Sequence, residues 1–261
     1  LRKMYSDKFK LHYDEITDKV QDFRAKRITA YLDLMNQMVD SNIQEVKDSM
    51  STNYDKVKDY IKNLPEASAL MQDFEELVNK RLNIDKVKEW VSDKLRKGSL
   101  DVNIMTKVDR DNYVDGEKLP IEFNDAHAAV RGFANSTLES AVILSAGMSP
   151  RLYSYFAQFE DFYPSKIGYI KKKIILKVSD YRSALIQGQF LAKKGIWVSE
   201  YRVESGLNCG GHAFATEGHL IGPILEDFKT KRNELAQTVF EILKGALEAQ
   251  EREVPEAVLS L

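Results

Sequence analysis

Apolar residues recur with a helical period through the first third of the chain. Between Ile16 and Met50 they keep close to a 3.6-residue spacing, and Lys, Asp and Glu fill most of the other positions. This pattern predicts one long amphipathic helix. Further helices are predicted at 53–63, 66–82 and 84–97 on the same grounds.

The pattern changes after residue 97, where short, nearly continuous apolar runs alternate with helix-like segments. Strands are predicted at 102–108, 140–146, 173–178 and 196–203. Helices are predicted at 123–135, 150–159 and 181–194, and from about 222 to 250. Continuous apolar strands separated by helices are typical of parallel βαβ units, so this part of the chain is predicted to be an α/β fold.

Glycine is distributed in a way that supports the same division. Residues 1–97 contain no glycine, and all thirteen glycines lie from Gly98 onward. Helix interiors exclude glycine, while strand–loop–helix folds use it at turns. We therefore expect a region of amphipathic helices at 1–97 and an α/β domain with a long C-terminal helix at 98–261. The helical region would either pack on the α/β domain or act as an arm that binds a helical partner or a second copy in a homo-oligomer.

Composition narrows the class of protein. The net charge of −2 gives no reason to expect a nucleic-acid partner, because proteins that bind phosphate backbones are usually basic. No apolar run approaches the roughly 18 residues of a membrane helix, so no membrane contact is predicted. A single cysteine cannot form an internal disulfide, which favours a cytoplasmic location. The chain starts at Leu1 and not at Met, so it is either processed, tagged and cut, or part of a longer protein.

Each predicted strand ends in residues that can take part in chemistry. The loops in question are 107–110, 145–151, 177–180 and 204–218. The last of these holds four of the thirteen glycines, the only cysteine and one of the four histidines. In parallel α/β folds the ligand sites lie on the loops after the C-terminal ends of the strands. The four loops therefore predict a site at one shared edge of the sheet.

Several sequence segments occur in an order that is similar to a known family of flavoproteins. They are Val102-Asn103-Ile104, Leu144-Ser-Ala-Gly-Met-Ser-Pro150, Ile175-Leu-Lys-Val-Ser179 and Cys209-Gly-Gly-His212. With these segments, residues 103–228 resemble the barrels of the nitronate monooxygenase family and the related FMN-dependent enoyl reductases. The resemblance implies parallel βα units of an incomplete or degenerate TIM-type barrel, preceded here by an α-helical N-terminal region.

The resemblance also implies a function and a set of site residues. The chain would be an FMN-dependent oxidoreductase acting on a small-molecule substrate, with His212 as the catalytic proton-transfer residue beside the flavin. Gly210 and Gly211 would let the backbone lie against the flavin ring. Lys177 would stabilise the negative charge of reduced flavin near N1. The cofactor-binding residues that the resemblance implies are Asn103, Gly147, Lys177, Glu204, Asn208, Gly210 and Gly211.

A second hypothesis is a non-catalytic structural or assembly protein with a degenerate flavoprotein-like half. Four strands are predicted where a closed barrel needs eight, and nothing after Gly222 resembles the family's glycine-rich phosphate turn. A third hypothesis is a hydrolase that uses Cys209 as nucleophile or a zinc ion held by Cys209, His212 and His219. The spacing of these three residues matches no established metal motif, so no metal is predicted.

Charged residues outside the glycine loop allow simpler interpretations. Arg151 would either bind a carboxylate or phosphate group or pair with Glu160 or Asp161. The run 171–173 is predicted to be a solvated stretch of lysines. The charges at 109–111 are typical of a surface loop, although they lie at the predicted site edge.

Overall fold

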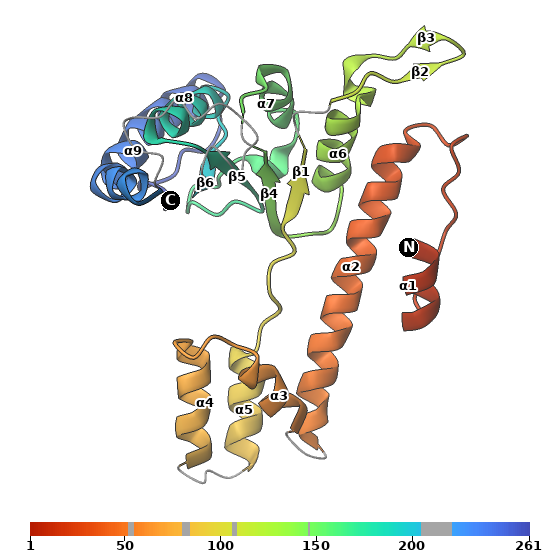
Figure 1. The fold of residues 1–261 in the computed structure, drawn as a ribbon, viewed down its shortest axis with the longest axis vertical. Coiled ribbons are helices and arrows are strands. Elements are labelled where there is room, and N and C mark those ends of the chain that lie inside the picture. The colour runs from red at the N-terminus through yellow and green to blue at the C-terminus, as the bar shows by residue number, and fades with distance from the viewer. Residues whose placement is uncertain (52–54, 80–83, 106–108, 146, 205–220) are drawn as a thin grey trace. The chain divides into compact units, whose positions relative to one another are not determined.

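The computed structural model describes residues 1–51, 55–79, 84–105, 109–145, 147–204 and 221–261 (Figure 1). These residues form two compact units. The first unit comprises Leu1–Tyr13 and Asp33–Gly98, and the second comprises Asp14–Leu32 and Ser99–Leu261. The long helix α2 (Phe23–Asp48) therefore contributes its first part to the second unit and its remainder to the first.

The first unit is helical, as the periodicity predicted. Its elements are α1 (Arg2–Phe9), the later part of α2, the 3-10 turn η1 (Ser49–Ser51), α3 (Asp55–Lys62), α4 (Ala69–Asn79) and α5 (Ile84–Lys94). Its core is a separate cluster of buried residues: Met50, Val57, Ile61, Phe74, Val87, Val91 and Leu95. One side of each of α3, α4 and α5 therefore supplies apolar residues that hold this unit together.

The long helix starts later than the apolar spacing indicated. It begins at Phe23 and not near Ile16, and a separate helix, α1, precedes it. Lys10 at the end of α1 and Asp22 just before α2 have φ angles of 55° and 56°. A residue with a left-handed backbone cannot continue a right-handed helix, so these two positions end one helix and delay the next.

The second unit contains a four-stranded parallel sheet, which confirms the predicted α/β class. Its strands are β1 (Val102–Ile104), β4 (Ser140–Leu144), β5 (Lys172–Val178) and β6 (Val198–Val203), in the order β1-β4-β5-β6. The connecting helices are α6 (Asp125–Ala134), α7 (Pro150–Phe156) and α8 (Tyr181–Ala192), and α9 (Ile221–Ala249) comes after β6. Helices α8 and α9 pack side by side (Figure 1).

Smaller elements lie in the connections between these strands and helices. A hairpin forms from β2 (Tyr113–Val114) and β3 (Glu117–Lys118), with Asp115 and Gly116 at positive φ in its turn. The sequence indicated only a loop here, because strands of two residues leave no periodic signal. The 3-10 turns η2 (Ile121–Phe123) and η3 (Glu160–Phe162) precede α6 and follow α7.

Helices α6, α7, α8 and α9 share a core with one face of the sheet. Alternate strand residues, among them Val142, Leu144, Ile174 and Leu176, belong to the same buried cluster as the apolar residues of α6, α7, α8 and α9. The intervening residues Ala141, Ile143 and Ile175 form a distinct small cluster. Because side chains alternate between faces along a strand, this second cluster marks the face opposite the helices. Residues 173 and 177 lie on that same face.

The prediction that the lysines at 171–173 are solvated is wrong for Lys172. Its side chain is fully buried, and its ammonium group donates to the carbonyl oxygens of Phe133 and Ser136 at 2.9 and 2.7 Å and to Ser136 Oγ at 3.0 Å. These acceptors lie at the C-terminal end of α6, where helix carbonyls have no partner within the helix. The neighbour Lys171 is half-buried and binds Asp161 at 2.7 Å.

Candidate functional site

Four of the eight residues implied by the flavoprotein resemblance lie in the described part of the chain. Asn103 is in β1, Gly147 follows β4, Lys177 is near the end of β5 and Glu204 directly follows β6. Because the four strands are parallel and adjacent, these positions lie toward one edge of the sheet. The remaining four, Asn208, Gly210, Gly211 and His212, lie outside the described residues, as do Cys209 and His219.

Lys177 and Glu204 are in direct contact at this edge. Lys177 Nζ lies 2.9 Å from Glu204 Oε1, and the two side chains are 22% and 27% exposed. The backbone N–H of Glu204 donates to the carbonyl of Val178 at 2.9 Å, which continues the pairing of β6 with β5 past the end of the strand. The glutamate accepts one of the three N–H groups of the ammonium, so the lysine retains donors for an electron-rich ligand atom.

Asn103 and Gly147 lie at the same edge without touching that pair. Asn103 is exposed and pairs in register with Ile143, so its side chain shares the face opposite the helices. Gly147 has a φ of 112°, a conformation that residues with a side chain rarely adopt, and its backbone is accessible. Among these four residues, Lys177 and Glu204 are joined by an ion pair.

A cavity between α6 and α7 is a second candidate site, and of its lining the sequence indicated only Arg151, as a residue that could bind a carboxylate or phosphate. The cavity has a volume of about 910 Å³. Its walls include Ile121 and Phe123 from η2, His127 from α6, and Pro150, Arg151 and Tyr155 from α7. A concave, largely apolar pocket of this size with a few polar groups is the usual form of a small-molecule site.

An aspartate–histidine pair borders this cavity. His127 Nδ1 lies 2.8 Å from Asp109 Oδ2, and the imidazole is only 2% exposed. The other oxygen, Asp109 Oδ1, accepts the backbone N–H of Ala126 at 2.8 Å. The carboxylate thus binds a free N–H of the first helical turn and also orients the ring. The two residues are eighteen positions apart and belong to a loop and a helix, so their contact leaves no local motif in the sequence.

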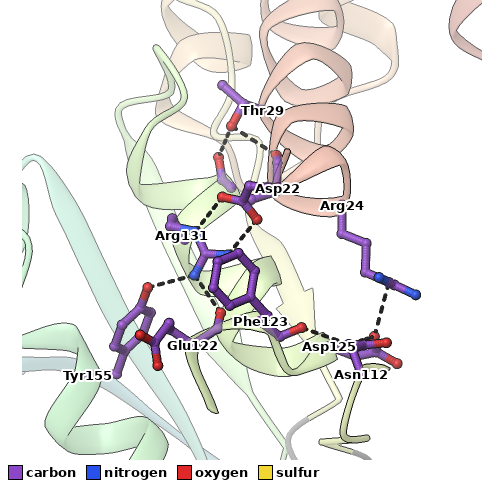
Figure 2. A network of polar contacts seen from close by, with 11 residues as sticks. Asp22, Arg24, Thr29, Asn112, Glu122, Phe123, Asp125, Arg131 and Tyr155 are labelled. Carbon is purple, nitrogen blue, oxygen red and sulfur yellow. Dashed lines mark hydrogen bonds and ion pairs between the residues drawn. The ribbon is translucent and has the colours of Figure 1, made fainter. Parts of the chain in front are cut away.

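Arg131 forms another wall of the cavity and is fully engaged with protein groups (Figure 2). Its Nε and Nη2 donate to the two oxygens of Asp22 at 2.7 and 2.6 Å, and Nη1 donates to Tyr155 Oη at 2.7 Å and to the carbonyl of Glu122 at 2.5 Å. Burial by itself lowers the pKa of Arg131, but the hydrogen bonds to Asp22 and Tyr155 outweigh it and raise that pKa. The guanidinium is therefore a structural cation whose charge Asp22 balances.

Arg151 differs from Arg131 in having no such partner. The proposed pairing with Glu160 or Asp161 is wrong, because Glu160 binds Arg252 at 2.6 and 2.7 Å and Asp161 binds Lys171. Arg151 forms no ion pair with any residue in the described ranges, although it lies close enough to Asp111 to contribute to the low pKa of that carboxyl, after the larger effects of Lys118 and Asn124. The exposed guanidinium is thus available at the mouth of the cavity.

The described residues contain no cluster of metal-ligating side chains and no helix that could span a membrane. These residues include no group of three or more His, Cys, Asp or Glu side chains placed to hold a metal ion. None of the described helices is long and apolar enough to cross a membrane.

No protein-family model, curated protein or solved structure matches this chain. The function must therefore be argued from the chemistry of the two sites.

Proposed function

We propose that this chain is a cytoplasmic FMN-dependent oxidoreductase of the nitronate monooxygenase or enoyl reductase type, built on parallel βα units of a TIM-type barrel. The observation that carries the proposal is the ion pair of Lys177 with Glu204 at the C-terminal ends of adjacent strands. Helices that share one face of the sheet and strands that succeed one another in chain order are also the arrangement found in such barrels.

The described residues fit the ring end of an FMN molecule. Lys177 supplies a cation held in place by Glu204, Asn103 supplies an amide on the same face of the sheet, and Gly147 supplies accessible backbone. When bound, FMN supplies hydride or single-electron transfer. Lys177 would stabilise the negative charge that the ring system carries when reduced, and Glu204 would limit that effect by sharing the ammonium. His212 would move a proton at the substrate carbon.

The cofactor proposal is tested by titrating the full chain with FMN. Binding is followed by the quenching of flavin fluorescence and by a shift of the visible flavin absorption bands. Lys177→Met is expected to weaken FMN binding at least tenfold because it removes a charge-assisted contact, worth about 1.5–3 kcal/mol. Lys173→Met is the matched control, since Lys173 is exposed on the same strand and the same face but near the other end. A chain that leaves the flavin spectrum unchanged would refute the proposal.

The role of His212 is tested separately with a nitroalkane anion as substrate. His212→Gln should lower kcat about 10²- to 10⁴-fold with little change in FMN affinity, because a general acid or base acts on the chemical step. His219→Gln serves as the control from the same segment and should retain kcat. Equal losses in the two variants would contradict a specific role for His212.

The assembly hypothesis remains the second candidate because the first unit has a core of its own. It also exposes Val78 and Ile84, which are 38% and 44% accessible. If this unit binds a second copy, light scattering should give a mass that rises with concentration, and Val78→Glu with Ile84→Glu should return it to the monomer value. A concentration-independent monomer mass for the parent chain would exclude self-assembly.

A further inference from the structure

The cavity between α6 and α7 brings together groups that the proposed oxidoreductase function does not use. Arg151 and Ser154 come from α7, His127 comes from α6, and Tyr155 of α7 contacts both the imidazole and Arg131. The apolar part of the wall is formed by Ile121, Phe123 and Pro150. The cavity is therefore bipartite, with an apolar body and a set of polar groups from two helices.

The hydrogen-bonding capacity of these groups favours an anionic oxygen ligand. Tyr155 Oη accepts from Arg131, which leaves the phenolic hydrogen free to donate. Because Asp109 binds Nδ1, His127 would present Nε2 to a ligand, and the described residues offer Nε2 no hydrogen-bond partner. The ring centroids of His127 and Tyr155 lie 5.0 Å apart, so a single ligand could contact both side chains.

The charge of Arg151 favours a negatively charged ligand. Of the two arginines that line the cavity, Arg131 is neutralised by the bidentate contact with Asp22, while Arg151 is exposed and forms no ion pair with described residues. A guanidinium presents parallel N–H groups that match the two oxygens of a carboxylate. The lining also includes Glu122, whose exposed side chain forms no ion pair with described residues, so Arg151 is the group of the lining that can pair with an anionic ligand.

We propose that this cavity binds a small organic carboxylate, whose carboxylate pairs with Arg151 and whose apolar part lies against Ile121, Phe123 and Pro150. His127, oriented by Asp109, and the Tyr155 hydroxyl bind further oxygen atoms of the ligand. The carboxylate site uses none of the residues proposed to bind FMN, so this proposal and the oxidoreductase proposal can fail separately.

Benzoate is a suitable probe because it combines one carboxylate with a compact apolar ring. Full-length protein labelled with ¹⁵N-histidine and with ¹³C in the isoleucine methyl groups would be titrated with benzoate and observed by NMR. We expect saturable shifts in the His127 ring and the Ile121 methyl signals. Arg151→Gln should weaken the apparent affinity at least tenfold, and Arg182→Gln, which removes an exposed arginine on α8, should leave it unchanged.

Three outcomes would overturn the proposal. One is the absence of saturable shifts with benzoate. Another is equal binding of benzamide, the neutral analogue, since the carboxylate would then be irrelevant. The third is unchanged affinity in Arg151→Gln. Benzoate has no oxygen atoms besides its carboxylate, so His127→Gln should lower its affinity less than Arg151→Gln does. The Arg151 and Ile121 measurements decide the question because both side chains are exposed.

Discussion

Lys172 carries its charge inside the core of the second unit, and its surroundings explain why it is tolerated there. The ammonium donates to three oxygens at the end of α6, and it lies 4.6 Å from the centroid of the Phe133 ring. A cation at a helix C-terminus is favoured by the helix dipole and by the carbonyls that the helix leaves unpaired. Such partners offset the desolvation cost of a buried charge.

Replacing this lysine should therefore be costly. Lys172→Met keeps most of the side-chain volume but removes the donor to the Ser136 carbonyl, while the Phe133 carbonyl keeps the backbone N–H and the hydroxyl of Ser136 as donors. The free energy of unfolding should therefore fall by about 1–3 kcal/mol. Urea denaturation followed by circular dichroism measures this change. The free energy of unfolding of Lys173→Met, a change at the adjacent exposed position, should stay within about 0.5 kcal/mol of the parent value. Similar losses in both variants would show that the buried contacts contribute little.

Two buried phenol groups, those of Tyr153 and Tyr201, make stability depend on alkaline pH. Tyr153 Oη donates to Gln187 Oε1 at 2.6 Å, whereas the hydroxyl of Tyr201 is buried and has no hydrogen-bond partner in the described structure. Burial raises the pKa of both phenols well above the usual value near 10. In the unfolded chain both would ionise at that ordinary value.

This difference predicts a loss of stability above about pH 10. Between the unfolded and folded pKa values the folded state binds more protons than the unfolded state, so the free energy of unfolding falls as pH rises. The stabilisation is fully present below the unfolded pKa. Urea denaturation at pH 8 and pH 11 should show a smaller loss for the double variant Tyr153→Phe with Tyr201→Phe than for the parent. Tyr113→Phe, at a position that is 60% exposed, should lose as much stability between pH 8 and pH 11 as the parent does. An identical pH dependence in all three proteins would contradict the role of burial.

At the scale of elements, the packing of α8 against β6 and α9 depends on a residue without a side chain. A methyl group built on Gly188 of α8 would overlap the hydroxyl of Tyr201 and lie 3.2 Å from Val239 Cγ2. Its distance to the ring carbon Cζ of Tyr201 would be 3.4 Å, which is ordinary contact. The overlap therefore comes mainly from one oxygen atom.

A double-mutant cycle tests this close approach. Gly188→Ala should destabilise the parent, because overpacking costs about 1–3 kcal/mol and exceeds the gain of about 1 kcal/mol in helix propensity. In a Tyr201→Phe background the same change should be neutral or stabilising, which gives a coupling energy of about 1–3 kcal/mol. Chemical denaturation of the four proteins measures it. Additive effects would mean that the helix relaxes away from β6 without cost.

For the whole molecule, the parts that the sequence predicted are those with a local signal. Helices α3 to α9 and the four parallel strands follow from apolar spacing, and the common edge of the strands follows from their being parallel. The burial of Lys172 and the pairing of His127 with Asp109 could not be predicted. In each case the partner groups come from a segment that is distant in the sequence. The spacing of residues along the chain does not show which distant segments will be neighbours in the fold. Residues 14–32 join the α/β unit for a similar reason, since Asp22 is fixed by Arg131 more than a hundred positions away.

The presence of two separate cores predicts that the two units lose structure independently. Val57 belongs to the core of the first unit and Val239 to that of the second, and both are fully buried helical valines. Truncating either valine to alanine removes two methyl groups and should lower the free energy of unfolding of its own unit by about 2 kcal/mol. Amide exchange that occurs through opening of that unit should then be roughly thirtyfold faster. Hydrogen exchange read by mass spectrometry should show this increase in α4 and α5 for Val57→Ala, and in β4 and β5 for Val239→Ala. Each variant is the control for the other, because the substitution is the same and only the core differs. If either change accelerates exchange equally in all four elements, the chain unfolds as one cooperative body, and the helical unit cannot act as a separately stable arm.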